Sequence, residues 1–137
     1  MVFKIILKNE HELLEEEAHL ICGYFELGET DFSINLFKDR SCMVMLTLSE
    51  ICDYLISNSQ KSFNWIGVDN GKYYVLKRQK ENLTISTKEF DVTFDLSIFK
   101  NALKKCLFTF ISYCKNVNQD IVNQGGFIDL EISFNKL

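Results

Sequence analysis

Two histidines and five cysteines are the residues of this 137-residue chain that could most readily do chemistry. His11 and His19 are eight residues apart, and neither has a histidine or cysteine partner at the spacing of a zinc site. We therefore expect ordinary surface or core histidines and predict no metal site and no cofactor.

The cysteines favour a structural role. Their number is odd and no pair forms a C-x-x-C motif, which is typical of free thiols in a reducing compartment. None lies in a glycine-rich turn or before an obvious helix start, where the pKa of a thiol falls. A nucleophilic cysteine paired in space with a histidine stays open, because such partners meet only in the fold. The five are Cys22, Cys42, Cys52, Cys106 and Cys114.

The motifs of several enzyme classes are absent. The chain contains no G-x-x-x-x-G-K-[ST], G-x-G-x-x-G or G-x-S-x-G sequence, and it has only six glycines with which to build a phosphate-binding loop. The sequence therefore gives no motif evidence for these enzyme classes.

Charge is unevenly distributed along a chain whose net charge is −4. Basic residues concentrate between Lys72 and Lys115, whereas acidic residues concentrate in the first third. An acidic surface of this size can steer a cationic partner and speed its association. The candidate partner-binding residues are Glu15, Glu16, Glu17, Glu26, Glu29 and Asp31.

A nucleic-acid surface is the competing interpretation of the basic residues. Lys77, Arg78 and Lys80 follow Tyr73 and Tyr74, and cations interleaved with aromatic rings can bind single strands. Three cations on a net-acidic chain attract a phosphate backbone weakly, and aromatic residues on strands usually form cross-strand pairs. We therefore predict no nucleic-acid partner.

The strongest structural signals lie between Ser62 and Asn116. Asn70-Gly71, between two apolar and aromatic runs, predicts a hairpin closed by a two-residue type I′ turn. Two further short strands with alternating apolar residues, near 83–87 and 90–94, extend it into a meander. Asp95 can cap a long helix near 96–116, whose apolar residues recur at steps of three and four.

Three other strands and a shorter helix are expected before the meander. The strands are predicted at Val2–Leu7, Ala18–Phe25 and Phe32–Phe37, and Cys42–Leu46 could form one more. Thr47-Leu48-Ser49-Glu50 fits a capping box and predicts a helix near 48–58.

The tail at 127–137 is ambiguous. Alternation of Ile128, Leu130, Ile132 and Phe134 favours a strand, while Phe127, Leu130 and Phe134 also fit a short helix. Together the elements predict one α+β domain over residues 1–137: a mainly antiparallel sheet packed by a long and a shorter helix.

No apolar run reaches the roughly 18 residues of a membrane helix. Val2–Leu7 is too short for the apolar region of a signal peptide. We predict a cytoplasmic protein without a membrane partner.

Four stretches, within roughly residues 18–116, resemble a group of small bacterial immunity proteins that are encoded beside polymorphic or contact-dependent toxins. They are Thr47–Leu55, Ser62–Asp69, the strand ending in Lys77-Arg78, and Phe94–Leu103. The resemblance implies a cytoplasmic, non-enzymatic protein that binds one cognate toxin domain, often a nuclease with a cationic groove, and blocks it. It also implies that the terminal segment could be a helix.

The predicted function is therefore toxin neutralisation through protein–protein binding, with a basic toxin as partner. The alternative is a non-enzymatic regulatory or scaffold module that binds a peptide or small ligand, which a sizeable apolar pocket would favour. An enzyme would need titratable groups gathered around Cys22 or His19 in a concave site.

Overall fold

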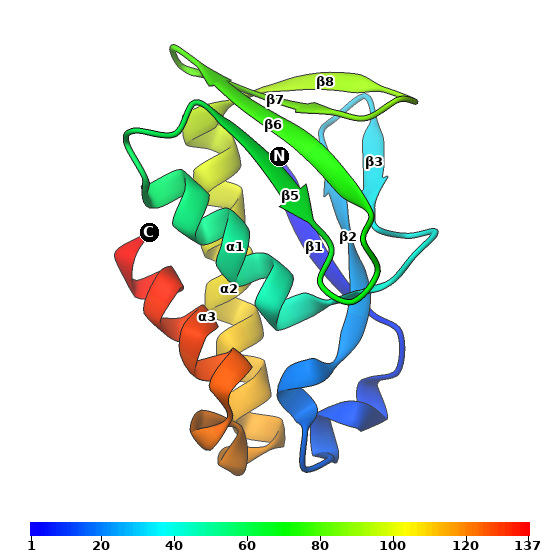
Figure 1. Ribbon diagram of the computed structural model, residues 1–137. Coiled ribbons are helices and arrows are strands. Elements are labelled where there is room, and N and C mark those ends of the chain that lie inside the picture. The colour runs from blue at the N-terminus through cyan, green and yellow to red at the C-terminus, as the bar shows by residue number, and fades with distance from the viewer.

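The first of two antiparallel sheets is organised around β2 (Cys22–Gly28) in the computed structural model, which describes residues 1–137 (Figure 1). One side of β2 pairs with β1 (Val2–Leu7), a strand at the predicted position. The other side pairs with β3 (Ser33–Leu36) and β4 (Cys42–Met43). Alternate residues of β2 are buried, so one face of this sheet belongs to the core.

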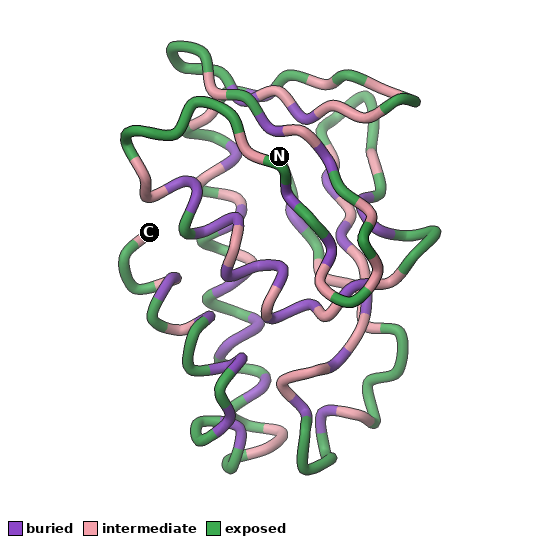
Figure 2. Tube along the Cα trace, viewed as in Figure 1, coloured by how far each residue is buried: buried purple, intermediate pink, exposed green.

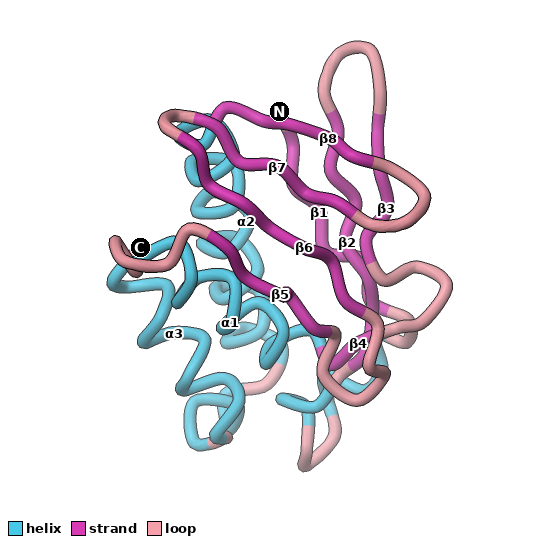
Figure 3. Tube along the Cα trace, turned by 45° about the horizontal axis from the view of Figure 1, so that its top comes forward, coloured by secondary structure: helices cyan, strands magenta, loops and turns pink.

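The second sheet is the meander that the sequence predicts, with strands in chain order (Figure 3). Its strands are β5 (Ser62–Ile66), β6 (Tyr73–Gln79), β7 (Asn82–Ser86) and β8 (Asp91–Asp95). Each neighbouring pair is antiparallel. The α+β class is therefore confirmed, with two sheets rather than one.

Three α-helices and three 3₁₀ helices complete the fold. The α-helices are α1 (Val44–Ile56), α2 (Leu96–Val117) and α3 (Gly125–Lys136). The 3₁₀ helices are η1 (Glu10–Leu14), η2 (Ala18–Leu20) and η3 (Gln119–Asn123). α1 and α3 lie side by side, and α2 packs along β1 and against the end of the meander (Figure 1). None of the helices is both long and apolar enough to cross a membrane.

An aromatic cluster joins the two sheets at the centre of the core. The Trp65 ring stacks on Phe25 at 5.5 Å between centroids and meets Phe37 edge-on at 5.3 Å. Its indole nitrogen donates to the Thr47 carbonyl at 2.8 Å, so the buried N–H is satisfied. Buried residues concentrate where the sheets and helices face one another (Figure 2).

The structure confirms the predicted start of the long helix and its apolar face. The Asp95 carboxylate accepts a hydrogen bond from the Ile98 amide at 2.9 Å, as an N-cap residue does. Phe99, Leu103 and Leu107 are buried along one face of α2. The helix ends at Val117, one residue beyond the predicted bound.

The predicted two-residue turn at Asn70-Gly71 is wrong, although the hairpin exists. The last paired residues are Ile66 and Tyr73, so six residues form the loop. Positive φ occurs at Asp69 (81°) and Gly71 (73°), and not at Asn70. The Asn70 amide instead donates to the carbonyls of residues 40 and 41, and Val68 bonds to Met43 and Thr47. These bonds attach the six-residue loop to residues 40–47, the segment that leads into the first turn of α1.

The predicted helix near 48–58 begins and ends earlier, at Val44 and Ile56. Thr47 therefore lies inside the first turn and is not a capping-box residue. Its hydroxyl accepts from the Val68 amide at 3.1 Å, a bond to the six-residue loop. The possible strand at 42–46 is correspondingly reduced to Cys42–Met43.

The strand predicted over 18–25 is wrong in its first half, because η2 occupies Ala18–Leu20 and β2 starts only at Cys22. The His19 side chain explains the difference. The imidazole Nδ1 accepts a hydrogen bond from the Gly126 backbone amide at 2.9 Å. The backbone amide of His19 donates to the Gln124 side-chain oxygen at 2.8 Å. These bonds attach η2 to the start of α3.

The strand favoured by alternation in the tail is wrong, and the helical alternative is confirmed. Phe127 and Leu130, three residues apart, are fully buried. Ile128 and Ile132, which alternation would bury, are 38% and 49% exposed. The helical spacing is the one that reaches the core, because only it places Phe127 on the same face as Leu130.

Candidate functional site

The six acidic residues predicted from the sequence are divided between two places. Glu15, Glu16 and Glu17 are exposed between η1 and η2, while Glu29 and Asp31 are exposed in the β2–β3 turn. The β1–β2 register pairs Val2 with Gly28 and Leu7 with Gly23, so the two places lie at opposite ends of this hairpin (Figure 1). Six residues of strand separate them by about 20 Å.

Glu26 and Glu29 line a hollow of about 440 Å³ beside the chain start. Glu26, on β2, is half-buried, and one of its oxygens lies 4.0 Å from the Lys4 ammonium. Such a pair at a solvent-exposed position contributes little stability. Neither Glu29 nor Asp31, at the same end of the hairpin, forms a salt bridge.

A second acidic concavity, absent from the prediction, lies between α1 and α3. We call it the acidic hollow. It has a volume of about 540 Å³ and brings together Glu50 and Asp53 of α1 with Asp129 of α3. Ser133 of α3 donates to the Asp53 carboxylate at 2.7 Å and ties the two helices together. The remaining lining is Leu46, Ser49, Val68, Ile132, Ser133 and a single cation, Lys136.

Burial and neighbouring carboxylates act on the titratable groups in this part of the molecule. Burial raises the pKa of Glu50, and the charge of Asp53 raises it further. Nearby, burial raises the pKa of the Cys22 thiol, and the charges of Glu12 and Asp69 add to the effect. A cationic group that entered the acidic hollow would relieve this repulsion and find apolar side chains beside it.

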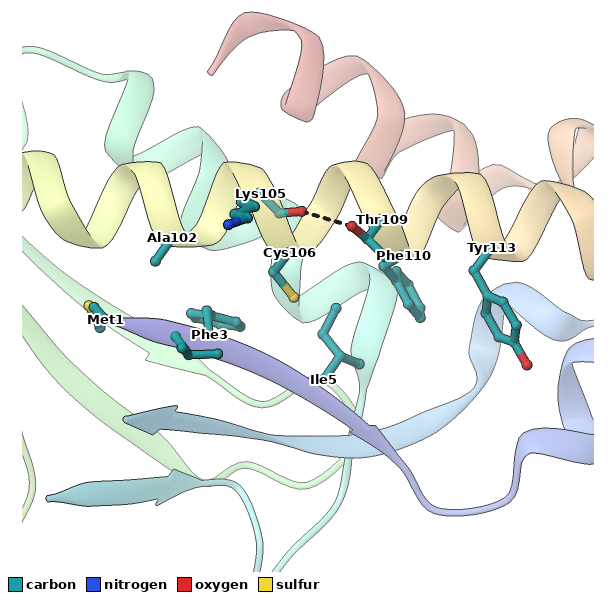
Figure 4. A pocket seen from close by; sticks show the side chains of 10 residues that line it. Met1, Phe3, Ile5, Ala102, Lys105, Cys106, Thr109, Phe110 and Tyr113 are labelled. Carbon is teal, nitrogen blue, oxygen red and sulfur yellow. Dashed lines mark hydrogen bonds between the residues drawn. The ribbon is translucent and has the colours of Figure 1, made fainter. Parts of the chain in front are cut away.

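An apolar groove of about 400 Å³ lies on another side of the molecule, between β1 and α2 (Figure 4). We call it the β1–α2 groove. Ile5 and Cys106 point toward one another across it, and Met1 and Tyr113 lie at its two ends. Eight of its ten lining residues are hydrophobic, and Lys105 is the charged one. The lining residues are Met1, Val2, Phe3, Ile5, Ala102, Lys105, Cys106, Thr109, Phe110 and Tyr113.

Another hollow, of about 580 Å³, is polar and carries both signs of charge. Lys72 donates to both Asp39 oxygens, at 2.6 and 2.7 Å. This hydrogen bond is the main reason that the pKa of Asp39 is lowered. The charges of Lys72 and Asp39 cancel, and the other charged residues of the lining are Arg40, Lys88 and Glu89.

The cysteines and histidines are not arranged for nucleophilic chemistry. Burial raises the pKa of Cys42 and Cys106 to about 11, and that of Cys52 and Cys114 to about 12. Thiols with such pKa values carry almost no thiolate at neutral pH. His19 is engaged with the start of α3. No three His, Cys, Asp or Glu side chains are grouped so that they could hold a metal ion.

Sequence reasoning missed both concave sites for the same reason. Asp129 joins Glu50 and Asp53 only because α3 packs on α1, and Ile5 meets Cys106 only because α2 packs on β1. The local signal that existed was the i, i+3 spacing of Glu50 and Asp53, which places two carboxylates on one helix face.

Comparison of this chain with protein-family models, with curated proteins and with solved structures finds no match.

Proposed function

We propose that this protein is an inhibitor of the immunity-protein type, which binds a cognate bacterial toxin domain and occludes its active site or substrate groove. The observation that carries the proposal is the acidic hollow. Carboxylates from two helices line the same concave, partly apolar place, and a basic toxin presents lysine or arginine side chains that fit it.

The hollow can act as the centre of an interface. An arginine that entered it would pair with Asp129 and Glu50 while its aliphatic part packed on Ile132 and Leu46. Buried cationic anchors of this kind are typical hot spots, each worth roughly 2 kcal/mol or more. The exposed Glu15–Glu17 segment precedes η2, which packs on α1 and α3, so it can add a carboxylate rim on this side.

The mechanism is occlusion rather than chemistry. Negative potential around the hollow would steer the toxin's cationic groove toward it and speed association. Bound carboxylates would then occupy the positions that the phosphates of a nuclease substrate require. The remaining predicted contacts, Glu26, Glu29 and Asp31, lie about a strand's length away and would touch only a partner that spans the β1–β2 hairpin.

The test is co-expression with the toxin domain encoded by the neighbouring open reading frame. The chain should restore growth and co-purify with that domain. The paired reversals Glu50→Lys and Asp129→Lys should weaken binding at least about tenfold. Glu81→Lys with Glu89→Lys, which reverses two exposed charges at turns of the second sheet, is the matched control.

Two results separate the parts of this proposal. A chain that neither restores growth nor co-purifies with the toxin domain is not its immunity protein. If the hollow variant binds the toxin as tightly as the control variant, the interface is another surface. Charge reversals at Glu15–Glu17 and, separately, at Glu29 and Asp31 then identify which acidic region binds.

A regulatory or scaffold module that binds a peptide or small ligand is the second candidate. The β1–α2 groove favours it, because its volume of about 400 Å³ and its apolar lining are typical of ligand sites. Ligand binding that protects the protein against heat, and that Ala102→Trp abolishes by filling the groove, would support this function over toxin neutralisation.

A further inference from the structure

We propose that the β1–α2 groove and the exposed face of α2 form a docking surface for an acidic and apolar segment of a partner protein. This inference deepens the second candidate function by naming the chemistry of the ligand. It does not depend on toxin neutralisation, which uses the opposite charge on a different pair of helices.

An exposed aromatic side chain also lies on α2 outside the groove. Phe108 is 67% exposed on α2, and Val2 and Tyr113 at the groove are 55% and 44% exposed. A small molecule seated in the groove would leave the Phe108 ring in water. A peptide segment that lies in the groove and crosses α2 would cover both, and aromatic side chains of this kind are enriched at protein interfaces.

The charge of α2 selects an acidic segment. The helix carries four lysines and no aspartate or glutamate, in a chain of net charge −4. Lys115 pairs with Glu131 of α3, but no salt bridge involves Lys100, Lys104 or Lys105. Lys104 and Lys105 precede Phe108 by four and three residues, so both residues lie one helical turn from it. A carboxylate beside an apolar side chain complements this arrangement.

The rest of the molecule disfavours an extended polyanion. A nucleic acid or an anionic membrane would bring many charges close to a protein that is acidic overall, and the repulsion would oppose the attraction to three lysines. A segment of about ten residues carries few charges, and salt screens the repulsion from carboxylates that lie more than about 10 Å away.

Three labelled synthetic peptides of about twelve residues test the inference by fluorescence anisotropy with the full chain. The first alternates pairs of glutamate with leucine or phenylalanine. The second replaces each glutamate by lysine, and the third replaces each apolar residue by serine. The first should bind at least about tenfold more tightly than either of the others, and its affinity should fall as salt is added.

Surface variants locate the binding. The affinity for the first peptide should fall at least about tenfold in the double variant Lys104→Glu/Lys105→Glu. It should fall by as much in the single variant Phe108→Ser. Lys77→Glu with Lys88→Glu, two exposed lysines of the second sheet region, is the charge-matched control and should not weaken it. Phe108 is exposed, so its replacement leaves folding intact, as circular dichroism can verify.

Any of four outcomes would overturn the inference. These are no binding of the first peptide at millimolar concentration, tighter binding of the lysine peptide, equal losses in the α2 and control variants, and tighter binding of polyuridylate or phosphatidylserine vesicles. Toxin co-purification measured with the same α2 variants keeps the two proposals separate, since it should be unchanged.

Discussion

The α1–α3 side and the α2 side of this protein present opposite charges to solvent. α1 and α3 together carry Glu50, Asp53, Asp129 and Glu131 against one cation, Lys136. α2 carries four lysines and no carboxylate. All three helices bury an apolar stripe against the same core. Three helices that pack on one core therefore carry different charges on their other faces.

The concavities sharpen this contrast. The acidic hollow places carboxylates within a depression, where burial already raises the pKa of Glu50. The β1–α2 groove places apolar side chains in the depression and lysine at its rim. The first arrangement suits a cationic anchor, and the second suits an apolar anchor with acidic neighbours.

The largest expected effect comes from removing the packing that creates the acidic side. Phe127→Ala should lower the free energy of unfolding by about 3–5 kcal/mol, because Phe127 is fully buried where α3 meets the core. Urea denaturation followed by circular dichroism measures it. Ile128→Ala, one residue further and 38% exposed, is the control and should cost far less. Equal costs would mean that α3 does not pack by the face described.

The next effect concerns the basic side. Asp95→Ala should lower the free energy of unfolding by about 1 kcal/mol, because it leaves the Ile98 amide at the start of α2 without its acceptor. Ser97→Ala, an exposed first-turn substitution, is the control. The urea midpoints of the two variants measure the difference. If Ser97→Ala lowers the free energy of unfolding as much as Asp95→Ala does, the capping role is contradicted.

The ion pair between Lys115 and Glu131 is the contact where the two sides meet. A double-mutant cycle with Lys115→Ala and Glu131→Ala should give a coupling energy of about 0.2–1 kcal/mol, since both side chains are partly exposed. Thermal denaturation at low and high salt measures it. The coupling should shrink in salt, and a coupling that stays constant would show that the contact is not electrostatic.

Local signals in the sequence were sufficient for most elements. The β1 strand, the meander and the Asp95-capped helix depend on neighbouring residues, and all were predicted. The predictions that failed involve residues whose hydrogen bonds go to distant partners. Asn70 bonds to residues 40 and 41, and His19 to residue 126. No pattern within a short window contains such partners.

The sites were less predictable than the fold. The acidic cluster Glu15–Glu17 stands out in sequence because its members are adjacent, yet they share no concavity with Glu29 and Asp31. Glu50 was interpreted as a capping-box residue, although it lines the acidic hollow. Acidic residues that are neighbours in the sequence indicate a high local charge density. A concave site requires packing between helices that are far apart in the chain.

The smallest effect is the pH dependence of Glu50→Gln. In the folded protein the pKa of Glu50 is raised, first by burial and then by the charge of Asp53, so folding disfavours the ionised form. The folded state therefore binds more protons than the unfolded state between the two pKa values, and Glu50 lowers stability as pH rises through that window. Near neutral pH the penalty is complete, and the uncharged glutamine should raise the melting temperature slightly.

Well below the usual glutamate pKa of about 4.3, Glu50 is protonated in both states, and the difference between Glu50→Gln and the unsubstituted protein should disappear. Scanning calorimetry at both pH values measures this change. Glu89→Gln, at an exposed turn, is the control for the loss of one surface carboxylate. A Glu50→Gln variant that is destabilised near neutral pH would mean that the carboxylate is favoured by a cation, and the acidic hollow would then lack the unbalanced negative charge that distinguishes it from the α2 side.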